Sequence, residues 1–181
     1  MKVERADIAD VLLLEPKVFS DARGFFYESY NRKAFAQATG LDVEFVQDNH
    51  SRSSKNVLRG LHYQLRQPQG KLVRVTAGEI WDVAVDLRRG SPSFGRWTAA
   101  TLSAKTHRML WVPAGFAHGF LVLSEHAEVQ YKATDYYAPE QERTLLWNDP
   151  ALVISWPLAG EPVMTDKDRR GKPLATAETF A

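Results

Sequence analysis

Apolar and polar residues alternate with a period of two along most of the chain, which indicates β-strands rather than helices. The alternating runs are rich in β-branched and aromatic residues, and turn residues separate them, as at 68–70 and 113–115. We predict strands over residues 43–49, 57–65, 71–76, 80–87, 96–102, 108–112, 116–123 and 127–134. Their even spacing is typical of a double-sheet barrel, so the pattern predicts an all-β jelly-roll fold.

The last of these strands carries a tyrosine on its apolar face. Ala127, Val129, Tyr131 and Ala133 share one side of the strand, because side chains alternate across it. We therefore expect Tyr131 to point into the interior, where its hydroxyl needs a partner.

Little helix is predicted. Residues 31–39 fit one helix, with Asn31 as its N-cap and Gly40 as its stop. After Asp149 the pattern is less regular, and we expect residues 167–174 to pack across the barrel mouth.

Length and charge narrow the classes of protein. A chain of 181 residues fits one domain spanning 1–181. With 23 basic and 22 acidic residues, its net charge of +1 produces no overall field to attract nucleic acid or acidic membranes. There is no cysteine, and no apolar run approaches the roughly 20 residues of a membrane span. We therefore expect a cytoplasmic protein that binds neither membranes nor nucleic acid.

Two segments have the form of metal motifs, but one of them is incomplete. Residues 113–118 read Pro-x-Gly-x-x-His, the second metal motif of small jelly-roll barrels. The first motif requires His-x-His and then a Glu, whereas this chain has His62-x-Gln64 and no Glu in 65–72. The sequence thus predicts the barrel without its metal cage.

The same residues suit proton transfer. A histidine can remove a carbon-bound proton, a lysine can stabilise an enolate oxygen, and a tyrosine can return a proton from the other face. His62, Lys71 and the inward Tyr131 provide these three groups. A base of this kind needs a carboxylate to orient its ring. The candidates for that carboxylate are Asp48, Asp82 and Asp168. Spacing does not choose among them.

A series of motifs then resembles one known family over nearly the whole chain. They include Asp21-x-Arg23-Gly24-x-Phe26, Gln47-Asp48-Asn49-His50-Ser51, Val57-Leu58-Arg59-Gly60-Leu61-His62, Gln69-Gly70-Lys71-Leu72-Val73-Arg74, Tyr131-Lys132-x-Thr134-x-Tyr136-Tyr137 and Lys167-Asp168. Together they resemble the dTDP-4-dehydrorhamnose 3,5-epimerases, cupin-type enzymes of dTDP-L-rhamnose synthesis. The resemblance implies a cupin-like barrel and cofactor-independent epimerisation at C3 and C5 of dTDP-4-dehydro-6-deoxy-D-glucose.

The resemblance also implies roles for individual residues. His62 is expected to be the base with Asp168 as its carboxylate, Tyr131 the acid on the opposite face, and Lys71 the group that stabilises the enolate at O4. Further positions match residues that line the site or bind the thymidine nucleotide, namely Arg23, Phe26, Glu28, Gln47, Asn49, Arg59, His118, Glu142 and Lys167. Phe26 resembles a base-stacking residue of this family, in which the early strand segment commonly reaches across to the partner of a homodimer.

Three alternatives remain open. A metal-dependent cupin would use His62, His118 and Glu79 as ligands, which is a poor set for a transition metal. A non-catalytic binding module would keep the arginines but need neither His62 nor Tyr131. A relative restricted to C3 or to C5 would keep much of the same frame.

Overall fold

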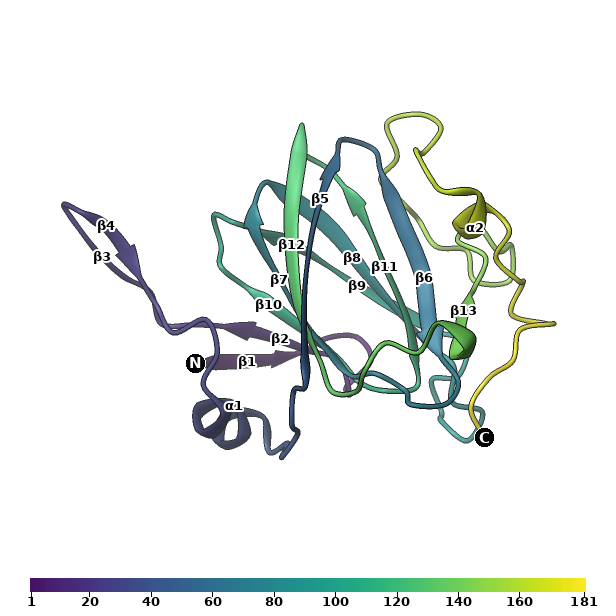
Figure 1. Ribbon diagram of the computed structural model, residues 1–181, viewed down its shortest axis with the longest axis horizontal. Helices are drawn as coiled ribbons and strands as arrows, with labels where there is room; N and C mark the ends of the chain where they lie inside the picture. The colour runs from purple at the N-terminus through teal and green to yellow at the C-terminus, as the bar shows by residue number, and fades with distance from the viewer.

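Two antiparallel β-sheets face each other and enclose the core of the protein (Figure 1). The computed structural model describes all 181 residues. One sheet has six strands in the order β1 (Lys2–Arg5), β2 (Leu12–Glu15), β10 (Met109–Val112), β7 (Lys71–Ala77), β12 (His126–Ala133) and β5 (Gln47–Ser54). The other has five, in the order β13 (Glu142–Thr144), β6 (Leu58–Gln64), β11 (Phe116–Val122), β8 (Glu79–Asp86) and β9 (Trp97–Ser103). The predicted jelly roll is confirmed.

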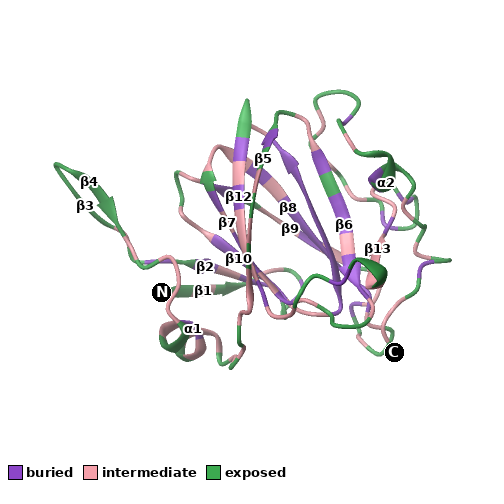
Figure 2. Cartoon of the chain, viewed as in Figure 1, coloured by how far each residue is buried: buried purple, intermediate pink, exposed green.

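The largest buried cluster lies between the two sheets. Val73 and Val129 come from the six-stranded sheet, and Ile80 and Phe120 come from the five-stranded sheet. Tyr131 packs against this cluster, so its predicted inward orientation is confirmed. The burial colours of Figure 2 follow the same division, with buried positions concentrated on the strands that form the barrel. Alternation along each strand therefore places one set of side chains in a shared interior.

A second cluster covers the outer face of the six-stranded sheet. Helix α1 (Arg32–Thr39) begins at Asn31, whose Oδ1 accepts from the Ala34 amide at 3.1 Å, and ends at Gly40 in the left-handed conformation. Both caps are as predicted. The helix buries Phe35 against Trp111 on the outside of the sheet.

One predicted strand was misplaced. Residues 43–46 were expected to start a strand at 43–49, but they precede it, and β5 runs over Gln47–Ser54. Val43 and Phe45 pack against the outer cluster instead. The actual strand is almost wholly polar, and its pairing with β12 along the edge of the sheet defines it. Backbone pairing therefore outweighed apolar pattern at this edge.

A hairpin extends away from the barrel. Strands β3 (Phe19–Asp21) and β4 (Gly24–Phe26) pair only with each other, and Figure 1 shows them projecting to one side. Phe25 is 62% exposed and Phe26 is 68% exposed. Two large aromatic side chains in water are costly, so this arm is shaped for a contact outside its own barrel.

The C-terminal residues pack along β6 and β13, close to the mouth of the barrel. A 3₁₀ turn (Pro139–Gln141) leads into β13, and the short helix α2 (Asp166–Arg169) lies beside β6. Thr165 caps α2 by accepting from the Asp168 amide at 3.3 Å. Neither α1 nor α2 has the length and apolar character of a membrane-crossing helix.

Strands β6 and β11 approach closely at two glycines. Gly60 has a φ of +117°, and a Cβ added there would lie 2.7 Å from the Gly119 Cα and from the His118 carbonyl oxygen. The next ladder position pairs His62 with His118. The glycines thus allow both histidines to enter the barrel side by side.

We expect Gly60→Ala to lower the free energy of unfolding by roughly 2–4 kcal/mol, because it adds both a backbone clash and an unfavourable φ. Urea denaturation measures this change. Gly90→Ala is the matched control, since no atom lies within 4 Å of a Cβ at that position. Equal stability of the two variants would contradict the close approach.

Candidate active site

A cavity of about 690 Å³ opens between the sheets. Side chains from five strands and from the segment before and within α2 line it. A smaller cavity of about 70 Å³ lies next to it and reaches Tyr137 and Glu142. His62, Lys71 and Tyr131 line both cavities. The three groups predicted to move protons and stabilise charge therefore lie where the two cavities meet.

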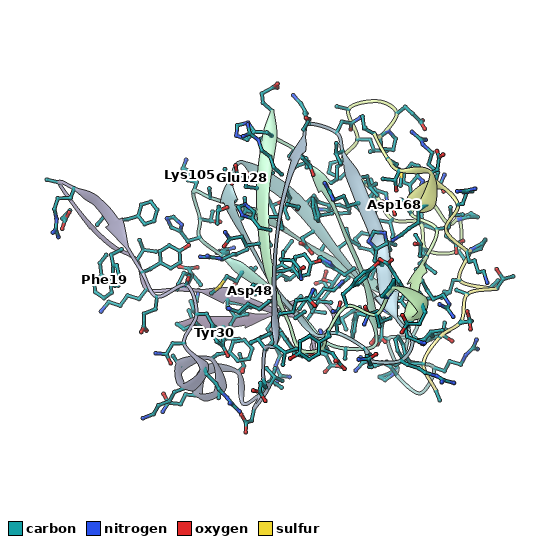
Figure 3. All side chains as sticks on the ribbon, viewed as in Figure 1. Phe19, Tyr30, Asp48, Lys105, Glu128 and Asp168 are labelled. Carbon is teal, nitrogen blue, oxygen red and sulfur yellow. The ribbon has the colours of Figure 1, made fainter.

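His62 is held by a buried carboxylate. Its Nε2 lies 2.6 Å from Oδ1 of Asp168, a residue only 3% exposed (Figure 3). Because a carboxylate only accepts hydrogen bonds, Nε2 donates and the second ring nitrogen is left free to take a proton. Desolvation raises the pKa of Asp168, but the hydrogen bond and charge of His62 outweigh it and hold this pKa below its ordinary value.

The other two candidate aspartates have different partners. Asp82 binds His118 inside the barrel, and Asp48 binds Lys132 at 2.9 Å on the outer side. The structure thus selects Asp168, which the residue spacing alone could not do.

Tyr131 and Lys71 face His62 from the opposite sheet. They lie on the neighbouring strands β12 and β7, whereas His62 lies on β6. The ammonium of Lys71 lies 5.7 Å from the centre of the Tyr131 ring. The arrangement places a base on one side of the cavity and a hydroxyl and a cation on the other.

Burial changes the proton affinity of both groups. Desolvation inside the barrel lowers the pKa of Lys71 to about 8, against the opposing attraction of Asp82 and Glu142. Desolvation raises the pKa of Tyr131, and the charge of Glu142 adds to the effect. Near neutral pH the phenol therefore keeps its proton and can donate it, while Lys71 is a cation close to its titration point.

Arg59 is oriented by a serine that the sequence analysis did not single out. Its Nε donates to the Ser53 hydroxyl at 2.9 Å, and Ser53 is buried. The guanidinium lines the large cavity with its terminal nitrogens unpaired within the chain. A guanidinium held in this way presents two donors to an anion.

Lys167 and Glu142 form a link across the mouth. Lys167 on α2 lies 2.5 Å from Glu142 on β13, and the Tyr137 hydroxyl donates to the same carboxylate at 2.9 Å. Desolvation opposes ionisation of Glu142, but these two hydrogen bonds keep its pKa below the ordinary value. Tyr137 was overlooked as a site residue, although it ends the Tyr131 to Tyr137 motif.

Gln47 and Asn49 form a short polar row on β5. The Gln47 side chain donates to Oδ1 of Asn49 at 3.0 Å and accepts from the Tyr137 amide at 2.9 Å. Asn49 lines the large cavity, and its buried Nδ2 has no partner within the chain. A buried polar atom without a partner is uncommon in a folded protein.

Three predicted binding residues lie away from this cavity. Arg23 pairs with Asp21 in the exposed hairpin at 2.6 Å, and Phe26 lies on the same hairpin. Glu28 follows the hairpin and accepts from Asn31 at 3.1 Å. Figure 3 shows the hairpin, marked by Phe19, on the opposite side of the molecule from Asp168.

The ligand set of the metal-dependent alternative is not assembled. His62 and His118 each direct Nε2 to a carboxylate, and Glu79 lies at the start of β8 with its backbone amide bonded to Ser124. No group of three or more histidine, aspartate or glutamate side chains is placed to hold a metal ion.

Known proteins share this fold and much of its sequence. The family model described as dTDP-4-dehydrorhamnose 3,5-epimerase matches residues 5–176. An enzyme of that name from Pseudomonas aeruginosa is 63% identical over 99% of both chains. A Legionella pneumophila 3,5-epimerase, solved in complex with dTDP-4-keto-L-rhamnose, is 50% identical, with a TM-score of 0.96 over 98% of this chain and 94% of that one.

A relative of narrower activity is also similar. A 3'-monoepimerase from Streptomyces bikiniensis, solved with dTDP-quinovose, is 35% identical, with a TM-score of 0.90 over 97% of this chain and 88% of that one. Both the family model and the relative at 63% identity nevertheless extend over almost all of this sequence. The chain therefore belongs to the dTDP-4-dehydrorhamnose 3,5-epimerase family.

Proposed function

We propose that His62, Tyr131 and Lys71 carry out the epimerisation, with Asp168 orienting His62. As a member of this family, the chain is an isomerase that inverts C3 and C5 of dTDP-4-dehydro-6-deoxy-D-glucose. The observation that supports these roles is the placement of the His62–Asp168 pair across one cavity from Tyr131 and Lys71.

The 4-keto group makes its neighbouring C–H bonds acidic. His62 takes the proton from carbon through its free ring nitrogen, and the electron pair of the C–H bond moves onto O4 to form an enolate. The Lys71 ammonium stabilises the negative charge that develops on that oxygen. Asp168 stabilises the imidazolium that forms and holds the ring in position. The enolate thus faces the Lys71 ammonium and the imidazolium faces Asp168, and both attractions are strong because little water screens them inside the barrel.

Tyr131 returns a proton to the same carbon from the other face, so the configuration inverts. Its raised pKa keeps the phenol protonated until the carbanion is formed. His62 then loses the abstracted proton to solvent, and Tyr131 regains one. The sequence of steps is repeated at the second carbon.

The remaining cavity residues serve to hold the nucleotide. Arg59 offers paired donors to the diphosphate, and Asn49 lines the cavity beside it. The same opening is bordered by His118 and by the Lys167–Glu142 link. Gln47 is connected to this link through its hydrogen bond with the Tyr137 amide. Binding through this remote group fixes the sugar relative to His62. No cofactor is needed in this scheme, because every proton and charge has a protein partner.

The hairpin supports a homodimer in which each arm completes the partner's site. Arg23 and Phe26 resemble nucleotide-binding residues of the family, yet they lie outside their own barrel. An arm with exposed aromatic rings and an arginine suits a nucleotide base and a diphosphate. Glu28 lies at the base of this arm.

We further propose that residues 1–181 form one cupin-like domain and that it acts in the cytoplasm. The shared core of the two sheets supports the first proposal. The absence of cysteine suits a reducing compartment and agrees with the second.

The roles of His62 and Tyr131 are separable by isotope exchange. In deuterated water, His62→Ala should lose deuterium incorporation at C3 and C5 of the sugar by at least about 100-fold, because no base remains. Tyr131→Phe should still exchange but fail to invert. NMR of the sugar nucleotide measures both. If His62→Ala still exchanged at both carbons, His62 would not be the base. In the native enzyme, exchange at C3 alone would indicate a monoepimerase. Nucleotide binding without any exchange would indicate a binding module.

Activity should decline as pH rises through about 8, where Lys71 loses its proton. The neutral amine no longer stabilises the enolate, so kcat falls on the alkaline side. A kcat profile across this range tests the prediction. Lys71→Arg is the control, since a guanidinium stays charged and its residual activity should show no decline near pH 8. An unchanged alkaline limb in Lys71→Arg would contradict the assignment.

Exchange of arms between subunits can be tested by complementation. One variant carries Arg23→Ala with Phe26→Ala, and the other carries His62→Ala, so each alone should be weak. Refolding them together should restore activity, because an intact barrel then receives an intact arm from its partner. No gain on mixing would show that the arm serves its own barrel or none.

A further inference from the structure

The barrel contains a second histidine–carboxylate pair that the proton transfers do not use. Asp82 on β8 is completely buried, and its Oδ1 accepts from Nε2 of His118 at 2.8 Å. His118 is only 7% exposed and borders the large cavity. Burying an ionised carboxylate costs desolvation free energy unless neighbouring donors or cations compensate its charge.

The second oxygen of Asp82 has no hydrogen-bond partner. Oδ2 is buried and meets no donor in the protein. Lys71 is a buried cation in the same situation, because its ammonium makes no hydrogen bond within the chain. Asp82 exerts the strongest attraction on this ammonium, ahead of Glu142. An unpaired buried anion and an unpaired cation thus face the same interior.

We propose that Asp82 is a positioning residue of the active site: one oxygen fixes the ring of His118, and the carboxylate supplies the counter-charge that keeps Lys71 protonated for its role at O4. Asp82 acts through these two neighbours. This role rests on the proposed function of Lys71.

The charges around Lys71 show why a counter-ion is needed. Asp82 attracts the ammonium from the facing sheet, and the titratable and charged groups that line the two cavities with it are Glu142, His62, His118, Tyr131, Arg59, Lys167, Asp168, His50, Tyr63 and Tyr137. Asp168 is bonded to His62, and Glu142 is bonded to Lys167. Oε1 of Glu142 also accepts no hydrogen bond, but among these carboxylates only Asp82 has a fully buried oxygen without a donor, so its charge is the one that neither a donor nor solvent offsets. Without it, desolvation would favour the neutral amine.

The sharpest variant is Asp82→Asn, which keeps the size of the side chain and an oxygen that can accept from His118 but removes the charge. We expect the alkaline limb of kcat to move to lower pH by about one unit. On the acid side of the limb, kcat and KM should stay close to those of the native enzyme, since Lys71 is still protonated there. Asp48→Asn removes an aspartate on the outer side of the same barrel and should leave the limb in place.

The results that would overturn the proposal are equally specific. An alkaline limb that stays in place or moves upward in Asp82→Asn would show that Asp82 does not hold the proton on Lys71. A fall in kcat of the same size at every pH would indicate a structural role only.

A second measurement needs no variant of Asp82 and no catalysis. In the native protein, carboxyl-carbon NMR should show the Asp82 signal shifting as pH passes through about 8, because the Lys71 charge disappears there. Lys71→Met should abolish this step. If the native protein shows no step, the coupling is absent and the proposal fails. If the step is present but isotope exchange does not depend on Lys71, the coupling stands and the catalytic role of Lys71 fails instead.

Discussion

The hydrogen bond between His62 and Asp168 is the contact on which the active site depends. It joins β6, the second strand of the five-stranded sheet, to α2, near the end of the chain. The Gly60 amide also donates to the same carboxylate at 3.4 Å. The C-terminal segment is therefore more than a cover for the barrel mouth, because it contributes the group that orients the base. The packing of residues 161–172 therefore also sets the orientation of the His62 ring.

The interior of the barrel is organised as pairs of opposite charge and hydrogen-bonding partners. Inside the barrel His62 pairs with Asp168 and His118 with Asp82, and Lys167 pairs with Glu142 at the mouth. Pairing offsets the cost of desolvation, so polar groups can remain in a space that would otherwise be apolar. Lys71 is the exception, since its ammonium is left without a hydrogen bond. A substrate oxygen that becomes negative during the reaction is the partner that it lacks.

The strands that enclose the core could be predicted because their sequence pattern reflects burial on one face. This holds for β12, where the alternation around Tyr131 matches the interior of the barrel. It fails for β5, whose eight residues are all polar because the strand lies at the edge of the sheet, between the cavity and the surface. Val43 and Phe45 alternate like the residues of a strand, but they cover the outside of the sheet beside α1. A strand with polar residues on both faces cannot be recognised from apolar–polar alternation, and strands that line binding sites are often of this kind.

The barrel, the inward tyrosine and the residue types suited to proton transfer could all be predicted from the sequence, because they depend on period-two patterning and on local motifs. The pairing of each histidine with its carboxylate became clear from the folded chain alone, since it depends on how the barrel closes over residues far apart in the sequence. The fold also places Arg23 and Phe26 on an arm outside their own barrel. A motif records the side chains that a site needs, whereas burial and closure decide which of them can touch.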